Sequence, residues 1–136
     1  MAILSERREV FNVVLGDPGA DDLQIHLFRA PANQPIEILS AYLIVQNAQG
    51  AGSAGAFQLE NWGTSGTAVE GTIAAAVGGT AAGPRIAANV PEAYTLTEGT
   101  VAAGAWVVMD YQETGDFVEQ QVTVNIEYIV GIGANA

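Results

Sequence analysis

Val118-Glu119-Gln120-Gln121-Val122-Thr123-Val124-Asn125-Ile126-Glu127-Tyr128-Ile129-Val130 is the stretch that decides the fold class. Apolar or aromatic residues occupy every second position of this stretch except Gln120, and the positions between them are mainly Glu, Gln, Thr and Asn. Successive side chains of a β-strand point to opposite faces, so this pattern predicts an antiparallel strand with one face in the core and the other toward solvent.

Shorter stretches on both sides of it alternate in the same way. They cover residues 23–28, 57–60 and 105–112, and residues 10–15 form a short strand that is apolar on both faces. Turn-forming Gly, Pro, Asn and Asp residues lie between them. Many short strands separated by turns predict an all-β protein, an antiparallel β-sandwich or jelly roll. Alanine favours helix in 74–77 and 87–93, but the surrounding Gly and Pro favour strand and loop.

The length limits the domain organisation. A chain of 136 residues builds one hydrophobic core, and a second would not fit. We therefore expect a single sandwich domain over residues 10–131, an N-terminal arm over 1–9 and a C-terminal tail over 132–136.

The segment from Ile36 to Val45 is apolar on both faces. Strict alternation would place Leu39, Ala41, Leu43 and Val45 on one face and Ile36, Ile38, Tyr42 and Ile44 on the other. Each face of such a strand has to be covered by other residues, one by the core and the other by a second layer. The second cover is either a loop of the same chain or another subunit. On the second alternative, Leu39, Leu43 and Val45 are candidate partner-binding residues.

The charge balance excludes several classes of partner. The chain has 15 acidic residues, four arginines and no lysine, which gives a formal net charge of -11. Four arginines cannot build the basic surface that nucleic acids or anionic membranes require. No stretch approaches the roughly 18 apolar residues of a membrane helix, and the first ten residues have no apolar segment typical of a signal peptide. There is no cysteine for a disulfide or a thiolate metal site.

Catalytic motifs are incomplete. The stretch 50–55 matches G-x-G-x-x-G, but the alternating residues after it predict a strand where a dinucleotide site needs a helix. Neither Ser53 nor Ser65 completes G-x-S-x-G, and His26 is the only histidine. It lies in an alternating strand, where a solvent-facing or locally bonded imidazole is the ordinary case. We expect no enzyme activity and no cofactor.

A loop with Asp17, Asp21 and Asp22 has the carboxylates that calcium prefers. Their spacing does not match the EF-hand loop, and Pro18-Gly19 is typical of a plain β-turn, so we expect no metal site.

Aromatic residues give the alternative function. Trp62, Trp106 and Tyr111 would suit a sugar platform, which makes a carbohydrate-binding β-sandwich module the second hypothesis. A sugar-hydrolysing enzyme with paired carboxylates is the third.

Four stretches together resemble small virion proteins of tailed bacteriophages, above all capsid decoration (cement) proteins. They are Ile36 to Ile44, Phe57 to Thr67, Tyr94 to Gly99 and Gly104 to Tyr111. The resemblance implies a protein without catalytic chemistry that binds the major capsid protein on the outside of the virion. It also implies self-association, with a trimer as the first expectation, and synthesis in the host cytoplasm. Head-fibre, neck and tail proteins are similar in appearance.

The N-terminal arm is a candidate attachment segment. Ile3 and Leu4 form an apolar patch outside any strand pattern, and Arg7 and Arg8 are half of all the arginines. Arginine is enriched at interfaces and pairs well with carboxylates. The alternative is that residues 6–9 simply begin the first strand.

The strand prediction is tested by Val124→Asp. This substitution buries a carboxylate without a partner, and we expect the free energy of unfolding to fall by about 3 kcal/mol or more. Thermal or urea denaturation measures the change. A variant that melts within a few degrees of the parent protein would show that the strand assignment is wrong.

Overall fold

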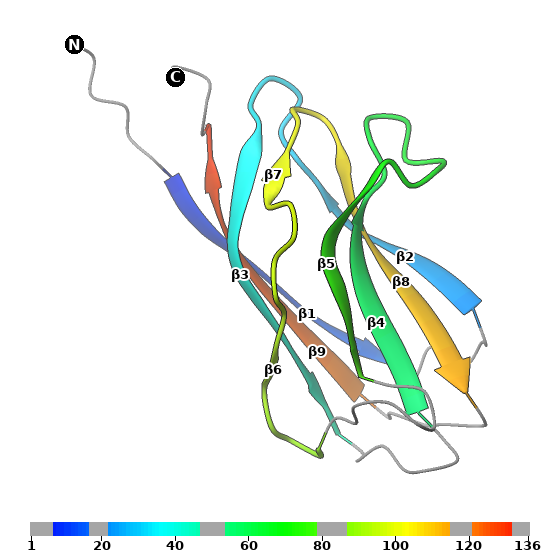
Figure 1. Ribbon diagram of the computed structural model, residues 1–136. Coiled ribbons are helices and arrows are strands. Elements are labelled where there is room, and N and C mark those ends of the chain that lie inside the picture. Colours follow the sequence, from blue (N-terminus) through cyan, green and yellow to red (C-terminus); the bar gives the residue numbers. More distant parts are fainter. Residues whose placement is uncertain (1–6, 17–21, 47–53, 79–86, 115–120, 132–136) are drawn as a thin grey trace.

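Two antiparallel sheets pack face to face in the computed structural model, which describes residues 7–16, 22–46, 54–78, 87–114 and 121–131 (Figure 1). The β9 sheet has the order β1-β9-β3-β6, and β7 also pairs with β3. The β8 sheet has the order β2-β8-β4-β5. The prediction of a single all-β sandwich is confirmed. The strands are β1 (Arg7–Gly16), β2 (Asp22–Arg29), β3 (Ile36–Val45), β4 (Ala54–Asn61), β5 (Gly71–Gly78), β6 (Glu92–Ala93), β7 (Thr100–Val101), β8 (Trp106–Thr114) and β9 (Gln121–Val130).

The central strands β9 and β8 supply the middle of the core. Val122, Val124 and Ile126 are completely buried, whereas Thr123, Asn125 and Glu127 between them are half-buried. In β8 the inward residues Val107, Met109 and Tyr111 are likewise fully buried. The predicted inward faces of both strands are confirmed, because each central strand has neighbours on both sides and a second sheet over one face. In β8, however, Val108 on the outer face is completely buried as well.

A β-bulge in β3 corrects the predicted faces of that strand. The pairing register with β9 shifts between Ile38 and Ser40, so Leu39 is the extra residue. A bulge of one residue exchanges inward and outward positions for the rest of the strand. After it, Leu43 and Val45 are completely buried on the same side as Ile38, and the residues between them are half-buried on the outer face.

Residues 92–101 form a strap that runs beside β3 on the edge of the β9 sheet (Figure 1). The backbone N–H of Tyr94 donates to the carbonyl of Ala41 at 2.9 Å, and that of Ile38 donates to the carbonyl of Gly99 at 2.8 Å. A Cβ at Gly99 would lie 2.7 Å from the Ile38 carbonyl oxygen, so this close approach requires glycine.

The same strap also bonds to the other sheet. The N–H of Thr97 donates to the carbonyl of Ile73 in β5 at 2.7 Å, and Ala74 of β5 forms an isolated bridge with Leu96. One segment therefore satisfies backbone groups on the edges of both sheets. This closes the β3–β5 side of the sandwich.

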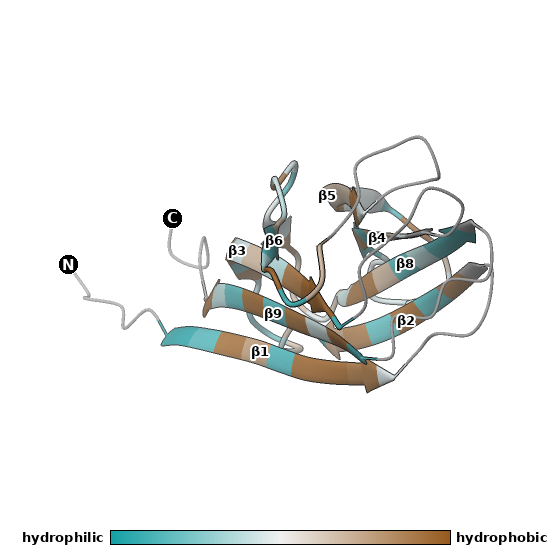
Figure 2. Cartoon of the chain, turned by 90° about the horizontal axis from the view of Figure 1, so that it is seen from below, coloured by the Kyte–Doolittle hydropathy of each residue, from teal (hydrophilic) through white to brown (hydrophobic). Residues whose placement is uncertain are grey.

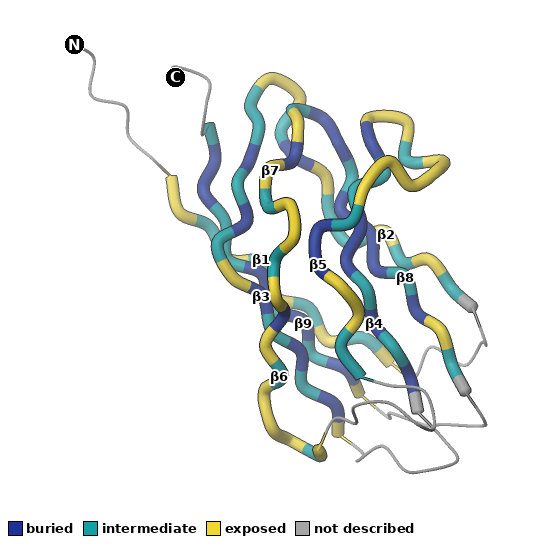
Figure 3. The backbone as a smooth tube through the Cα atoms, viewed as in Figure 1, coloured by how far each residue is buried: buried dark blue, intermediate teal, exposed yellow. Residues whose placement is uncertain are grey.

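The opposite side, between β1 and β2, is less well covered, and we call it the open side. Phe28 stacks on Phe11 with ring centroids 4.8 Å apart and on Tyr128 at 5.1 Å. The inward apolar side chains here are only partly buried, whereas those near the strap are mostly buried, with Val77 and Leu96 as the exceptions (Figure 3). These residues are Phe11, Val13, Leu15, Leu23, Ile25, Leu27, Phe28 and Tyr128.

The N-terminal boundary differs from the expected one. Arg7, Arg8 and Glu9 pair with β9 as the first residues of β1, so they belong to the sheet and not to an arm. Of the two alternatives for this segment, the structure shows the strand. Residues 1–6 and the predicted C-terminal tail, 132–136, lie outside the described residues.

Tyr94 provides a test of the packing. Its hydroxyl is buried and has no hydrogen-bond partner among the described residues, and burial raises the pKa of the phenol well above its usual range. An unpaired buried hydroxyl costs about 1–3 kcal/mol. We expect Tyr94→Phe to raise the free energy of unfolding by about 1 kcal/mol in urea denaturation.

The same variant has a pH signature. The phenol ionises near pKa 10 in the unfolded chain and higher in the folded one. The titration of this phenol therefore does not change the free energy of unfolding below pH about 10, and it lowers that free energy as the pH rises further. Tyr94→Phe should make this alkaline loss less steep, whereas Tyr42→Phe, on the outer face, serves as the control. An unchanged or steeper alkaline loss in Tyr94→Phe would contradict the assignment.

Candidate interaction surfaces

The structure corrects two of the candidate partner-binding residues. Leu43 and Val45 are completely buried against the β8 sheet, so their side chains belong to the core and the assignment to an outer surface was wrong. The bulge that changes the phase of β3 is the reason. Leu39 is half-buried at this bulge, and Ile3 and Leu4 lie outside the described residues.

The other two candidates, Arg7 and Arg8, are exposed at the start of β1. Nε of Arg7 lies 2.8 Å from Oε1 of Glu9, and Nη1 of Arg8 lies 3.0 Å from Oε1 of Glu127. Exposed pairs of this kind contribute little to stability. They do neutralise the local charge, so this end of β1 carries no net excess of either sign among these four residues.

The outer face of the β9 sheet has a patch without charge. The pairing registers place Asn12, Asn125 and Tyr42 in one row across β1, β9 and β3, and Val14, Thr123 and Ile44 in the next. Val14 is 55% exposed, and Tyr42 and Ile44 are half-buried. We call these six residues the uncharged patch. Figure 2 shows the alternating polar and apolar bands of β1 and β9 from which it is built.

The outer face of the β8 sheet is different in chemistry. Nε2 of Gln24 donates to Oδ1 of Asp110 at 2.8 Å, and Nε2 of Gln58 donates to Oε2 of Glu60 at 2.8 Å. Gln112 also reaches Asp110, at 3.5 Å. This face therefore carries two carboxylates held by amide side chains: Asp110 is half-buried among exposed glutamines, whereas Glu60 is buried.

An aromatic cluster sits at the end of that face. The ring centroid of His26 lies 5.5 Å from Trp62 and 5.3 Å from Trp106, edge-on to both, and its Nε2 is 2.7 Å from the carbonyl oxygen of Gly66. Nε1 of Trp62 donates to Glu60 at 2.9 Å. The rings thus contact one another and the turn that follows β4.

Trp106 is held in place from two further sides. The guanidinium carbon of Arg29 lies 5.6 Å from its ring centroid, and a Cβ at Gly66 would lie 2.6 Å from its Cδ1. Tyr111, the third residue of the predicted sugar platform, is completely buried. The structure brings the two tryptophans together around His26 but places Tyr111 in the core, so that platform as predicted does not form.

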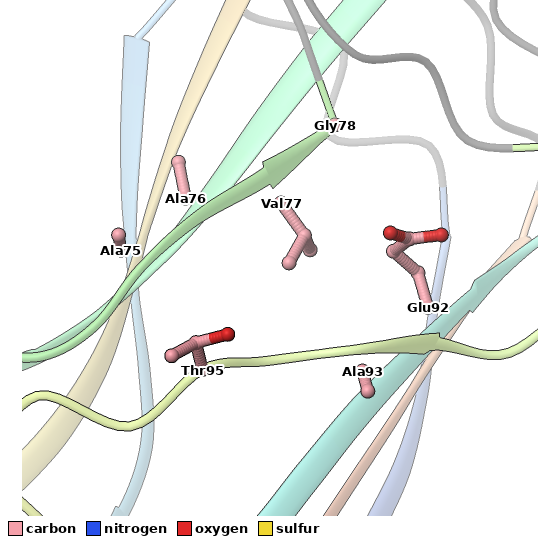
Figure 4. A pocket seen from close by; sticks show the side chains of 7 residues that line it. All are labelled: Ala75, Ala76, Val77, Gly78, Glu92, Ala93 and Thr95. Carbon is pink, nitrogen blue, oxygen red and sulfur yellow. The ribbon is translucent and has the colours of Figure 1, made fainter.

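A groove lies between β5 and the strap, where the two diverge beyond the Ala74–Leu96 bridge (Figure 4). Its volume is about 240 Å³. The sequence did not predict it, because it depends on the path of the strap. Small side chains and one carboxylate line it: Ala75, Ala76, Val77, Gly78, Glu92, Ala93 and Thr95.

The candidate metal and nucleotide sites from the sequence lie largely outside the described part of the chain. Asp17, Asp21 and most of the glycine-rich stretch 50–55 lie outside the described residues. Within the residues that are described, no three His, Asp or Glu side chains gather to hold a metal ion. The same residues contain no helix that is long and apolar enough to cross a membrane.

No family model matches the sequence. No curated protein matches it either. Among solved structures, the chain is similar to part of a chain in the structure of infectious bursal disease virus Gx strain, with 16% identity and a TM-score of 0.49. The similarity covers 97% of this chain and 34% of that one, so this chain spans about a third of its length. A likeness of this strength carries no argument about function.

Gly66 tests whether Trp106 is packed on the turn. Gly66 has a φ of +66°, and its position leaves no room for a Cβ beside the indole. We expect Gly66→Ala to lower the free energy of unfolding by about 1–3 kcal/mol and to change tryptophan fluorescence. Gly131→Ala is the matched control, because Gly131 also has a positive φ, of +86°, but a Cβ there would come no closer than 3.7 Å to Gln34, an ordinary contact. Equal stability of the two variants would mean that Trp106 is free of the turn.

Proposed function

We propose that the protein is a non-enzymatic structural subunit of a virion, a decoration (cement) protein that binds the outside of a bacteriophage capsid. The uncharged patch on the outer face of the β9 sheet is the observation that carries the protein-binding part of this proposal. The virion and its outer surface come from the sequence resemblance in the four stretches from Ile36 to Tyr111.

The patch has the chemistry of a protein interface. The centre of such interfaces is depleted in charged residues, and tyrosine is enriched there. Here a chain of formal net charge -11 presents six adjacent outward residues without a carboxylate. Val14 and the half-buried Ile44 and Tyr42 lie on strands of one sheet, so the surface is broad. A sheet face of this composition suits contact with another protein.

The charge elsewhere fits the proposal. A decoration protein is present in many copies on one particle, and net negative charge keeps such a protein soluble at high local concentration. On the outer face of the β8 sheet, the half-buried Asp110 and the exposed Gln24 and Gln112 around it would then face solvent on the decorated particle. The partner in this proposal is the major capsid protein. Head-fibre, neck and tail positions are the alternatives within the same class.

A carbohydrate-binding module is less well supported. Sugar platforms need aromatic faces open to solvent, whereas Trp62 and Trp106 contact His26, and Trp106 also lies against Gly66 and under Arg29. We therefore make no second proposal from these rings.

Binding to shells tests the proposal. Asn125 lies at the centre of the patch on β9, and Asn125→Arg would bury an unpaired charge in the contact. Such a charge costs about 2–5 kcal/mol, so co-sedimentation with empty capsid shells of the virus that encodes the chain should weaken at least about 30-fold.

Gln112→Arg is the matched control. It replaces an outward amide on the central strand of the other sheet. We expect this variant to bind as the parent does, with both variants folded by circular dichroism. No co-sedimentation of the parent protein would contradict the capsid role. Equal binding by the two variants would contradict the claim that the uncharged patch is the surface that binds the capsid.

A further inference from the structure

The edges of the two sheets are not equally protected. The strap covers the β3 edge of the β9 sheet through β6 and β7. In the β8 sheet, the pairing of β2 shifts register after His26, and that of β5 shifts twice. By contrast β1 pairs with β9 over ten consecutive residues without any shift. Among the described strands, β1 is the long, regular edge.

Beyond the charged residues Arg7, Arg8 and Glu9 at its start, that edge also lacks the residues that protect natural edge strands. Bulges, proline and lysine commonly keep an edge from pairing with another chain. From Arg7 to Gly16 there is no proline, lysine or bulge. Val10 and Val14 are each 55% exposed, and the inward residues Phe11 and Val13 are only partly buried. An edge of this kind is a template for another strand.

We propose that β1 is a self-association edge, through which two copies of the chain pair in antiparallel orientation. The proposed register places Asn12 of one copy opposite Asn12 of the other, on a two-fold axis perpendicular to the sheet. The β9 sheets of the two copies then form one continuous sheet. This interface uses the β1 edge of both copies, so assembly through it stops at two. We propose this pair in place of the trimer that the resemblance implies.

The sequence of β1 is self-complementary in that register. On the outer face Val10 lies opposite Val14 of the other copy, and on the inner face Phe11 lies opposite Val13. Apolar and aromatic–β-branched cross-strand pairs of this kind are favourable. A shift by one residue would exchange the two faces of the sheet. A shift by two would oppose Val10 with Asn12 or with Gly16 and lose the valine pair.

The charges near the edge do not oppose the pairing. The two arginines are already bonded to Glu9 and Glu127, so each copy brings a locally balanced edge in spite of its overall charge. Arg8 of one copy would lie opposite Gly16 of the other. The space beside Gly16 is open, with nothing within 4 Å of a Cβ placed there, so a long side chain fits.

A single introduced cysteine tests the axis. Since the chain has no cysteine, Asn12→Cys carries the only thiol and can form a disulfide only with a second copy. Directly opposed residues of an antiparallel pair bring their Cβ atoms close to disulfide range. We expect a disulfide-linked dimer of Asn12→Cys under mild oxidation. The control is Val90→Cys, at a position that is 49% exposed outside β1.

A charge on the edge tests the pairing itself. We expect the parent protein to be a dimer at high concentration by light scattering, and Val10→Lys to be a folded monomer. Val69→Lys, at a position 52% exposed outside the strands, should remain a dimer. A trimeric or monomeric parent, or equal cross-linking of the two cysteine variants, would overturn the proposal. These measurements need no capsid, and Val10 lies outside the uncharged patch, so their failure is distinguishable from failure of the proposed function.

Discussion

The rest of the structure depends on the packing of β9 against β8 through side chains that water does not reach. Val122, Val124 and Ile126 on one strand and Val107, Met109 and Tyr111 on the other are completely buried. Because side chains alternate along a strand, burying one face of each sheet commits the other face to the surface. The inward face sets the stability, and the outer faces and free edges are what remains for function.

The strand edges are covered on one side of the sandwich and free on the other, among the described residues. On one side the strap bonds to β3 through Tyr94 and to β5 through Thr97, so both edges are covered by one segment. On the other side β1 and β2 have no such cover among the described residues, and the aromatic rings of Phe11, Phe28 and Tyr128 hold them together. This asymmetry explains why most of the partly buried apolar residues lie on the open side. It also leaves β1 as a long, regular edge among the described strands.

Periodicity predicted the strands but could not predict the faces everywhere. The alternation from Gln121 to Glu127 is unbroken, and the structure confirms it because β9 pairs regularly with β1; at the end of the strand Tyr128 is half-buried and Ile129 is buried. In β3 one extra residue at Leu39 reversed the assignment of Leu43 and Val45, and a bulge in a doubly apolar strand leaves no mark in the hydrophobic pattern. The uncharged patch was equally invisible. Asn12, Asn125 and Tyr42 become neighbours only through the pairing of three strands that are far apart in the sequence.

The outer faces of the two sheets are therefore the centre of the functional account. One face carries Tyr42, Ile44 and Val14 among uncharged polar groups, and the other carries Asp110 between two exposed glutamines. Electron cryomicroscopy of capsid shells saturated with the protein tests this difference most directly. The account predicts density in which the outer face of the β9 sheet lies against the shell and the β8 sheet faces solvent. Shells that bind the protein through the β8 sheet, or that bind none, would contradict it.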